Sequence, residues 1–472
     1  MELTKRIKSR LSEATDWNTV LDAFESEASS AGDASAQSKA FFELAGVDEG
    51  VVLDKARAMQ CYQKAFKLDK RNLLALQHAR EIYQEMAHLE MVKRLMGLEL
   101  KVNRDPTRAP ELNYAYGRAI LNLREIDQAR QFLELAASSD ATNSEFQDRF
   151  QETLYDRGNW QFALQNIFTQ LGALTGSQDP LAAEVVNRGE QFSTLFMKAA
   201  RILQQESPDD QRLLPLLFKA LDANPLNEEA GFVAESLLAG GGHLQHIQKL
   251  QDRRASLVDE IGQRVALLRS FAIAWQIRPS LNNPDMAAYF YRQALELAYS
   301  TGSETLADTK GHPWHVGAFR MLKIQADQQG RADGLVDLAQ RGIALIPDDD
   351  DRALVALSAG EIAWKVDNNV ESARGLFAIA QSLAANHPTL RDFVAQHGAL
   401  GEAPSRAAEE QARREAEEQA QRAAEEQARR EAEAQAQREA EAQAQREAQA
   451  QARREEQARR EAEAQAQREA QA

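Results

Sequence analysis

The chain of 472 residues has a single cysteine, Cys61, and few aromatic residues, which make up 7% of the sequence. One cysteine cannot form a disulfide within the chain, and it excludes a zinc site built from several thiolates. No stretch approaches about 18 consecutive apolar residues, so we expect no transmembrane helix. The N-terminal segment MELTKRIKSRLSEATDW has basic residues but no apolar run after them, unlike a secretory signal. The sequence therefore predicts a soluble, cytoplasmic protein.

An excess of positive charge is also missing. The chain has 56 Lys and Arg against 72 Asp and Glu, which gives a formal net charge of -16 at pH 7. Residues 401–472 hold 13 Arg, no Lys and 18 Glu, so most of the acidic excess lies in residues 1–400. Binding to nucleic-acid phosphates requires a basic surface. The charge balance therefore predicts an acidic, well-solvated surface and no nucleic-acid partner.

The sequence does contain an internal repeat. In ARAMQCYQKAFKLDKRN, small and large residues alternate at spacings of four, three and three, at Ala58, Tyr62, Ala65 and Leu68. This spacing puts them on one face of an α-helix, with small side chains where a neighbouring helix approaches closely. The same frame recurs at Ala129, Leu133 and Ala136, at Ala287, Tyr291, Ala294 and Leu297, and at Ala373, Phe377, Ala380 and Leu383. A looser copy contains Leu213, Leu217 and Ala220.

Turn residues separate these helices at a regular distance. Gly117 lies twelve residues before Ala129, and Ala163 lies 34 residues after Ala129 and follows Gly158 and Trp160. These features resemble the tetratricopeptide repeat, a helical hairpin with a period of about 34 residues. The resemblance covers about residues 35–390. The family's small residue on the first helix fits Gly117, its glycine-x-aromatic turn fits Gly158 with Trp160 and later Gly330, and its terminal proline fits Pro106, Pro225 and Pro347.

The resemblance implies an all-α fold, a right-handed superhelix of eight or nine stacked antiparallel hairpins. Since one hairpin cannot bury its apolar face alone, the hairpins stack and share a continuous core. The family usually holds an extended or helical peptide on the concave inner surface, so the resemblance implies a protein partner. The units near 85–105 and 240–260 match poorly. The spacings from Ala163 to Leu213 and from Ala287 to Leu335 are stretched, which predicts longer helices or loops there.

We divide the chain into four parts. Residues 1–34 are expected to form an N-terminal helical cap, with a helix near 3–28, and residues 35–400 the repeat array. Residues 401–404, GEAP, form a linker, because glycine and proline interrupt helices. Residues 405–472 form a low-complexity tail.

The tail repeats an eight-residue unit, seen twice in AEAQAQREAEAQAQRE at 432–447. Ala, Glu, Gln and Arg are strong helix formers, and pairs such as Glu409 with Arg413 support a helix at i,i+4. An eight-residue period gives no straight seam along an α-helix, and alanine offers little surface to bury. We therefore expect a solvent-exposed single helix that acts as a spacer or tether. A loose coiled coil and a largely disordered tail are the alternatives.

Two histidine pairs have a spacing that can ligate a metal, His312 with His315 and His243 with His246. Neither pair has an acidic or cysteine partner at a fixed offset. Pro313 and Trp314, which lie between the first two histidines, predict instead the start of a helix and its packing anchor. We therefore expect no metal site.

Other motifs also have simple structural interpretations. The aspartates of Pro347–Asp351 lack the alternating ligands and the glycine of a calcium loop, and they predict a helix cap. GGG at 240–242 has no Lys, Ser or Thr after it and predicts a turn rather than a phosphate loop. Cys61 is expected to be a buried structural thiol. The tryptophans are expected mostly in the core, at Trp160, Trp275, Trp314 and Trp364, and the candidates for an acidic-peptide clamp, Asn113, Arg118 and Arg157, do not recur in phase.

The sequence identifies no catalytic, cofactor-binding or metal-binding residue. We therefore expect a non-catalytic scaffold or adaptor, without a cofactor, that binds protein segments on the concave face of the array. The partner-binding residues are unknown at this stage. The alternative is a structural protein whose arrays self-associate into a larger complex or filament.

Overall fold

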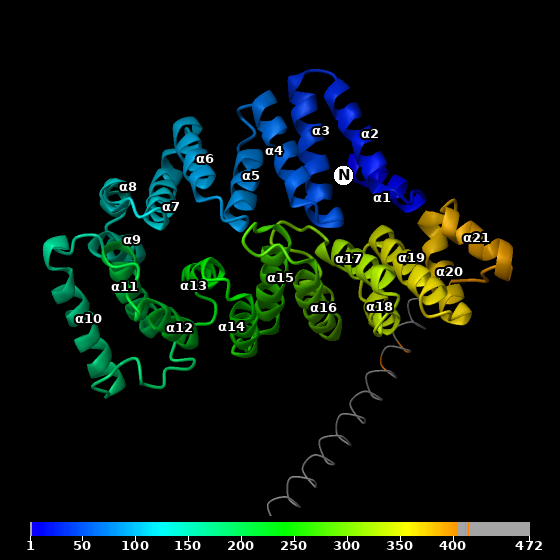
Figure 1. The fold of residues 1–472 in the computed structure, drawn as a ribbon. Helices are drawn as coiled ribbons and strands as arrows, with labels where there is room; N and C mark the ends of the chain where they lie inside the picture. The colour runs from blue at the N-terminus through cyan, green and yellow to red at the C-terminus, as the bar shows by residue number, and fades with distance from the viewer. Residues whose placement is uncertain (1, 404–410, 412–413, 415–472) are drawn as a thin grey trace, which may run out of the picture. The chain divides into compact units, whose positions relative to one another are not determined.

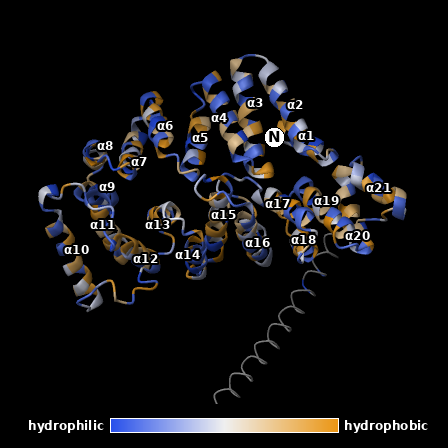
Figure 2. Cartoon of the chain, in the orientation of Figure 1, coloured by the Kyte–Doolittle hydropathy of each residue, from blue (hydrophilic) through white to orange (hydrophobic). Residues whose placement is uncertain are grey.

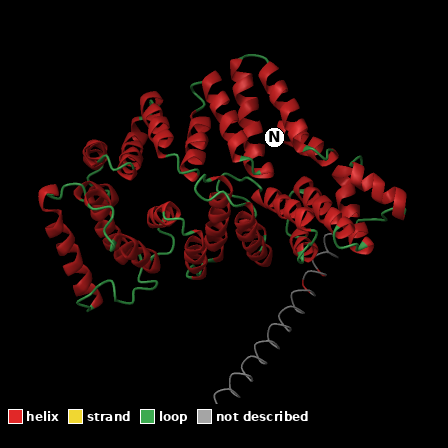
Figure 3. Cartoon of the chain, in the orientation of Figure 1, coloured by secondary structure: helices red, strands yellow, loops and turns green. Residues whose placement is uncertain are grey.

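The computed structural model describes residues 2–403, 411 and 414, and the regular secondary structure in these residues is entirely helical (Figure 3). The first helices are α1 (Glu2–Glu13), α2 (Trp17–Ser30), α3 (Ala34–Val47), α4 (Lys55–Leu68), α5 (Leu73–Glu85), α6 (Leu89–Val102), α7 (Ala109–Asn122), α8 (Ile126–Ser139), α9 (Ser144–Gln151) and α10 (Trp160–Thr175). They are followed by α11 (Glu190–Glu206), α12 (Leu213–Ala223), α13 (Glu228–Gly240), α14 (Leu244–Ser256), α15 (Ile261–Ile277), α16 (Pro284–Thr301), α17 (Trp314–Gln329), α18 (Leu335–Ile343), α19 (Asp349–Lys365), α20 (Val370–Ala384) and α21 (Pro388–His397). A π-helix, η1 (Asp48–Val52), follows α3, and η2 (Pro106–Arg108), η3 (Arg157–Asn159) and η4 (Ser303–Thr305) are short 3-10 turns.

Most consecutive helices pack against one another along the chain, although α9 with α10 and α17 with α18 do not (Figure 1). The closest pairs are α3 with α4, α7 with α8, α11 with α12, α15 with α16, and α19 with α20. Hydrophobic and hydrophilic residues share the same helices (Figure 2), as expected for helices that are buried on one side. The predicted all-α class, an α-solenoid of stacked helical pairs, is confirmed. The single-helix tail predicted for 405–472 falls outside the described residues, which include only 411 and 414 of that range.

Glycines allow the two helices of a hairpin to approach closely. A Cβ atom at Gly117 on α7 would lie 2.7 Å from Cγ of Leu133 on α8. A Cβ atom at Gly360 on α19 would lie 2.7 Å from the ring of Phe377 on α20. Both distances are shorter than real Cβ contacts, so a larger residue at either position would push the hairpin apart.

The residues of the repeated frame lie mostly between helices. The buried ones are Ala58, Tyr62, Ala65, Gly117, Ala129, Leu133, Ala136, Ala220, Ala287, Tyr291, Ala294, Ala373, Phe377 and Ala380. Trp160 and Ala163 on α10 are only half-buried, because α10 packs mainly against α11. Gly158 lies in η3, and Gly330 ends α17 with a φ of 65°.

Several local predictions agree with the helix boundaries. Asp348 is the N-cap of α19 and accepts a hydrogen bond from the amide of Asp351 at 2.9 Å. Trp314 is the first residue of α17 and is 2% exposed. The GGG segment contains the end of α13 at Gly240 and the turn that leads into α14.

The N-terminal segment differs from the prediction. One helix was expected near 3–28, whereas α1 and α2 are separate helices, because Asp16 caps α2 by accepting a hydrogen bond from the amide of Asn18 at 3.0 Å. The two stretched spacings correspond to long connections, residues 176–189 between α10 and α11 and residues 302–313 between α16 and α17. Among the described residues, none of the helices is both long and apolar enough to span a membrane.

The first helices also contact the last ones, which nearest-neighbour stacking does not provide. α1 packs against α19 and α20, η1 against α17, and α5 against α15. Figure 1 shows α1–α5 beside α15–α20. One large core draws its buried residues from α1–α5 and from α10 onwards, while α6–α9 have two small clusters of their own. We call the contact between α1–α5 and α15–α20 the closure. The helices α6–α9 therefore connect α5 to α10, while α1–α5 and α15–α20 are held together by contacts that do not involve α6–α9.

Candidate functional site

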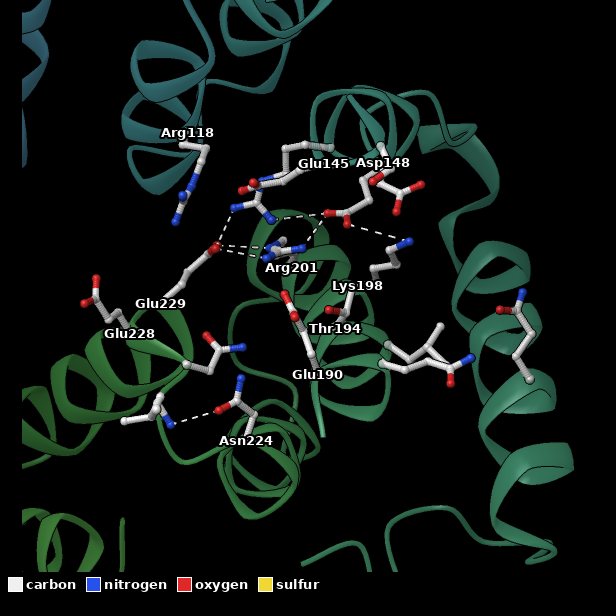
Figure 4. Close-up of a pocket in the computed structure, with 18 of the residues that line it drawn as sticks. Arg118, Glu145, Asp148, Glu190, Thr194, Lys198, Arg201, Asn224, Glu228 and Glu229 are labelled. Carbon is white, nitrogen blue, oxygen red and sulfur yellow. Dashed lines mark hydrogen bonds and ion pairs between the residues drawn. The ribbon is translucent and has the colours of Figure 1, made fainter. Parts of the chain in front are cut away.

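A cavity of about 1000 Å³ lies among α7, α9, α10, α11 and α13 (Figure 4). Three of these, α7, α11 and α13, pack against the helix that follows them, whereas α9 packs against α8 before it. Most of the side chains that line the cavity are charged or carry amides. A second cavity of about 330 Å³ adjoins it and shares Asp148, Glu152, Gln170, Lys198, Arg201 and Glu229 with it. We treat this region as the candidate site.

Five side chains on the wall of the cavity form a network that we call the pocket cluster: Arg149, Glu152, Lys198, Arg201 and Glu229. Arg201 on α11 donates to both carboxylate oxygens of Glu229, at 3.0 and 2.9 Å, and also to Glu152. Arg149 on α9 donates to Glu229 at 2.5 Å and to Glu152 at 3.3 Å. Charge-assisted, bidentate bonds of this kind fix geometry as well as adding stability. The cluster therefore ties α9, α11 and α13 together at the cavity wall.

The position of Arg149 explains how this charge becomes buried. Phe146, Arg149, Phe150 and Thr153 follow one another at helical spacing, so the guanidinium lies on the apolar face of α9. Arg149 is 5% exposed. A charged residue in the middle of an apolar face was the sequence signal for this site, and the sequence analysis missed it.

Burial changes the proton affinity of the cluster. It raises the pKa of Glu152 to about 7, although Arg149 and Lys198 act in the opposite direction. Burial alone would lower the pKa of Arg149, but Glu229 and Glu152 outweigh it and raise that pKa. Burial therefore opposes the ionised form of Glu152, while the two carboxylates favour the charged form of Arg149.

Further charged side chains surround the cluster at the rim of the cavity. Figure 4 shows Arg118 and Glu190 reaching toward the pocket cluster from α7 and α11, whereas Glu228 on α13 points away from Glu229. The guanidinium of Arg118 lies 5.6 Å from the ring centre of Tyr114. Glu190 and Glu228 are exposed and Arg118 is half-buried, and none of the three forms an ion pair with the pocket cluster among the described residues.

A second charged network lies at the closure, and we call it the closure cluster: Asp48, Glu49, Lys55, Lys310 and His312. The side chain of Glu49, in η1, is 1% exposed and accepts hydrogen bonds from Lys55 at 2.9 Å and from Lys310 at 2.8 Å. The hydroxyl of Tyr62 donates to the same carboxylate at 2.9 Å. Burial would raise the pKa of Glu49, but Lys55 and Lys310 outweigh it and hold the pKa at about 2. Glu49 is therefore an ionised, buried link between η1 and the segment before α17.

Asp48, the neighbour of Glu49, has the opposite environment. Burial raises its pKa to about 8, and the guanidinium of Arg57, with Nε 3.4 Å from the carboxylate, offsets this only in part. The thiol of Cys61 lies 3.8 Å from the same carboxylate, and burial raises the pKa of that thiol to about 12. Cys61 is 1% exposed, as predicted for a structural thiol.

A further set of contacts holds α1 in the closure. Lys8 forms ion pairs with Asp351 at 2.6 Å and with Asp348 at 3.3 Å. The hydroxyl of Ser12 donates to the carbonyl of Leu383 at 3.1 Å. The aspartates that the sequence identified as a helix cap therefore also anchor the first helix of the chain.

The histidines with metal-like spacing have separate environments. His312 lies 3.8 Å from Glu49 in the closure cluster, and His315 is buried, with Nδ1 2.8 Å from the carbonyl of Leu306. His243 and His246 pack edge to face. In the part of the chain that the structure describes, no group of three or more His, Cys, Asp or Glu side chains is placed to hold a metal ion.

The other predicted residues are also dispersed. Trp275 is fully buried like Trp314, whereas Trp364 is half-buried. Of the three candidates for a peptide clamp, Arg118 lines the cavity. Arg157 instead pairs with Glu206 at 2.8 Å. Asn113 is not among the residues that line the cavity.

The stacked helical pairs with their closely packed small residues define an α-solenoid. No protein-family model and no curated protein matches the chain. Among solved structures, one similar chain comes from the "Crystal structure of APC/C hetero-tetramer Cut9-Hcn1". The two chains are 17% identical, the match covers 74% of this chain and 73% of that one, and the TM-score is 0.19.

Proposed function

We propose that the chain is a non-catalytic scaffold that binds a segment of another protein in the cavity among α7, α9, α10, α11 and α13. The observation that carries this proposal is the cavity itself, about 1000 Å³ in volume and lined by side chains from five helices. Small-molecule sites are mostly apolar, with a few polar groups. This cavity has charged and amide side chains from five helices, which suits a peptide with many polar groups.

The state of the acidic groups supports binding rather than catalysis. Glu152 and Glu229 accept hydrogen bonds from Arg149 and Arg201, so these carboxylates are engaged within the wall. A general acid or base has to reach its substrate directly or through one water. The pocket cluster instead makes a rigid wall against which a ligand can pack.

The self-assembly alternative has less support. An array that stacks end to end must offer the faces of its first and last repeats to another copy. Here α1 already packs against α19 and α20 of the same chain. We therefore expect a monomer by light scattering over a range of concentrations, and growth of the particles with concentration would favour the alternative.

We propose that residues 405–472 act as a spacer or tether for this scaffold. Their repeated units contain no large apolar residue that would anchor a docking helix. An isolated 405–472 peptide should give a helical circular dichroism spectrum that weakens with salt, because salt screens its Glu–Arg pairs. A random-coil spectrum would exclude a helical spacer.

Selection from a phage-displayed library of short random peptides tests the binding site. The full chain serves as bait beside two variants of α10, Ala173→Trp and Gln165→Trp. Ala173 lines the cavity, whereas Gln165 is exposed on the same helix and lines neither cavity. We expect peptides that bind the original chain and Gln165→Trp but not Ala173→Trp. If every selected peptide binds all three proteins equally, the cavity is not the binding site.

A further inference from the structure

The pocket cluster has little capacity left to bind a charged ligand. The two carboxylates accept from two guanidinium groups, and Lys198 lies 3.8 Å from Glu152. A ligand that used these groups would have to break existing ion pairs. The charges that select a ligand are therefore the remaining ones, at the rim.

The remaining charges are mainly acidic. Asp148, Glu190 and Glu228 line the cavity, are exposed, and form no ion pair among the described residues. Glu145, also exposed, accepts a hydrogen bond from the hydroxyl of Tyr114 at 2.6 Å. Arg118 is the single cation on the cavity wall, in the described part of the chain, that has no carboxylate partner.

The rest of the wall suits a peptide. Leu174 on α10 is 41% exposed and Leu195 on α11 is half-buried, so both present apolar surface to the cavity. Gln170 and Gln191 line it with exposed side-chain amides, which can pair with a peptide backbone. The Nε of Arg149, buried on the same wall, has no hydrogen-bond partner among the described residues.

We propose that the segment bound in this cavity is basic, with two or more Lys or Arg residues that pair with Asp148, Glu190 and Glu228 and an apolar residue that packs on Leu174 and Leu195. This inference rests on the proposed function and specifies its partner. The acidic rim repels carboxylate-rich peptides and nucleic acids. The net charge of -16 also makes a second copy of this chain a poor occupant.

Exposed ion pairs are individually weak and sensitive to salt, so the preference should be moderate and should decrease with ionic strength. Glu190 and Glu228 are also the first residues of α11 and α13, where a carboxylate favours the helix dipole. A stability measurement alone would report that role. The test therefore has to measure peptide affinity and its dependence on charge.

The test uses the peptides that bind the full chain and Gln165→Trp but not Ala173→Trp. We expect Lys and Arg to outnumber Asp and Glu in these peptides. A synthetic copy of the most enriched peptide should bind the Glu190→Gln/Glu228→Gln variant about tenfold more weakly by fluorescence anisotropy, which corresponds to about 1.4 kcal/mol. A version of the same peptide with Gln in place of each Lys and Arg should lose affinity for the original chain and show no further loss with the variant.

The matched control is Glu134→Gln/Glu304→Gln, which removes two exposed carboxylates outside the cavity and should leave the affinity unchanged. Selected peptides that depend on the cavity but are neutral or acidic would overturn the basic-segment inference and leave the proposed function standing. Equal affinity of the selected peptide for the original chain and for Glu190→Gln/Glu228→Gln would also overturn the basic-segment inference and leave the proposed function standing. Failure to select any peptide that depends on Ala173 would overturn the proposed function itself.

Discussion

The closure cluster and the pocket cluster use the same chemistry in different surroundings. Each places carboxylates between basic side chains contributed by separate segments of the chain. The closure is tightly packed at Gly50, since a Cβ atom there would lie 2.6 Å from Cβ of His312. The pocket cluster borders a cavity of about 1000 Å³. Packing, rather than the kind of charge, therefore separates a cluster that holds the fold together from one that can receive a ligand.

Replacing the central carboxylate of the closure should have the largest effect. Glu49→Leu leaves Lys55, Lys310 and the Tyr62 hydroxyl without their shared acceptor in a buried site. We expect the free energy of unfolding to fall by about 3–5 kcal/mol, measured by urea denaturation. Glu81→Gln removes the 42%-exposed partner of Lys310 and should cost no more than about 1 kcal/mol. Similar losses in the two variants would show that burial does not determine how much each of these two carboxylates stabilises the protein.

The pH dependence of stability should identify Asp48 as the strained member of the closure cluster. The folded protein keeps the Asp48 proton up to a pKa of about 8, whereas an unfolded chain releases it near the ordinary aspartate pKa of 3.8. The folded state therefore binds more protons between these values, and its stability falls as the pH rises through that range. The slope from this residue is at most about 1.4 kcal/mol per pH unit.

The variant Asp48→Asn lacks this contribution. Its stability relative to the original protein should therefore increase steadily from pH 5 to pH 8 in urea titrations. Glu152, with a pKa of about 7, affects both proteins equally, so the difference between the two curves isolates Asp48. A difference that stays constant over this range would mean that the carboxyl is already ionised in the folded protein.

Breaking the pocket cluster should cost less than breaking the closure. Arg201→Met removes a donor from Glu152 and Glu229, but water in the adjoining cavity can solvate both carboxylates. We expect a loss of about 1–3 kcal/mol in the free energy of unfolding. Arg157→Met, a surface control whose side chain is 44% exposed, should change it by no more than about 1 kcal/mol. A loss as large as that of Glu49→Leu would remove the energetic distinction between the clusters.

Adding a single methyl group tests the packing of the closure at Gly317, with the exposed Gly375 as the control. Gly317→Ala would place Cβ 2.8 Å from the carbonyl oxygen of Val51 and 2.5 Å from Cγ of Leu53, and should destabilise by about 1–3 kcal/mol. Gly375 lies exposed within α20, and a Cβ there meets no atom within 4 Å. Gly375→Ala should therefore stabilise the helix by up to about 1 kcal/mol, measured as a rise in Tm. A destabilised Gly375→Ala variant would contradict this difference between closure and surface.

The parts of the fold that depend on local spacing were predictable from the sequence. Ala58, Tyr62 and Ala65 show helical periodicity within a few residues, and the cap at Asp348 depends on its immediate neighbours. Gly330 likewise marks a turn through its own backbone preference. Such features need no knowledge of how distant repeats are arranged.

The closure and the cavity depend on long-range geometry instead. Lys310 and Glu49 are 261 residues apart, and the curvature of the whole array determines whether they meet. The sequence nevertheless places Asp48 and Glu49 in the short segment AGVDEGVV, between residues that belong on a packing face. Arg149 gives a similar signal on α9. Charges on apolar faces were the available clue, but the sequence does not state which charges would pair with them.

The long-range contacts of α1 also affect the order in which the protein acquires its structure during synthesis. The helix α1 needs Asp351 and the carbonyl of Leu383, which are made more than 300 residues later. The hairpins from α3 onward can form in sequence, since their contacts are local. Lys8 and Ser12 therefore stay without these distant partners until α19 and α20 have been made. The helix α1 is thus synthesised before the hairpins but is fixed in place after them.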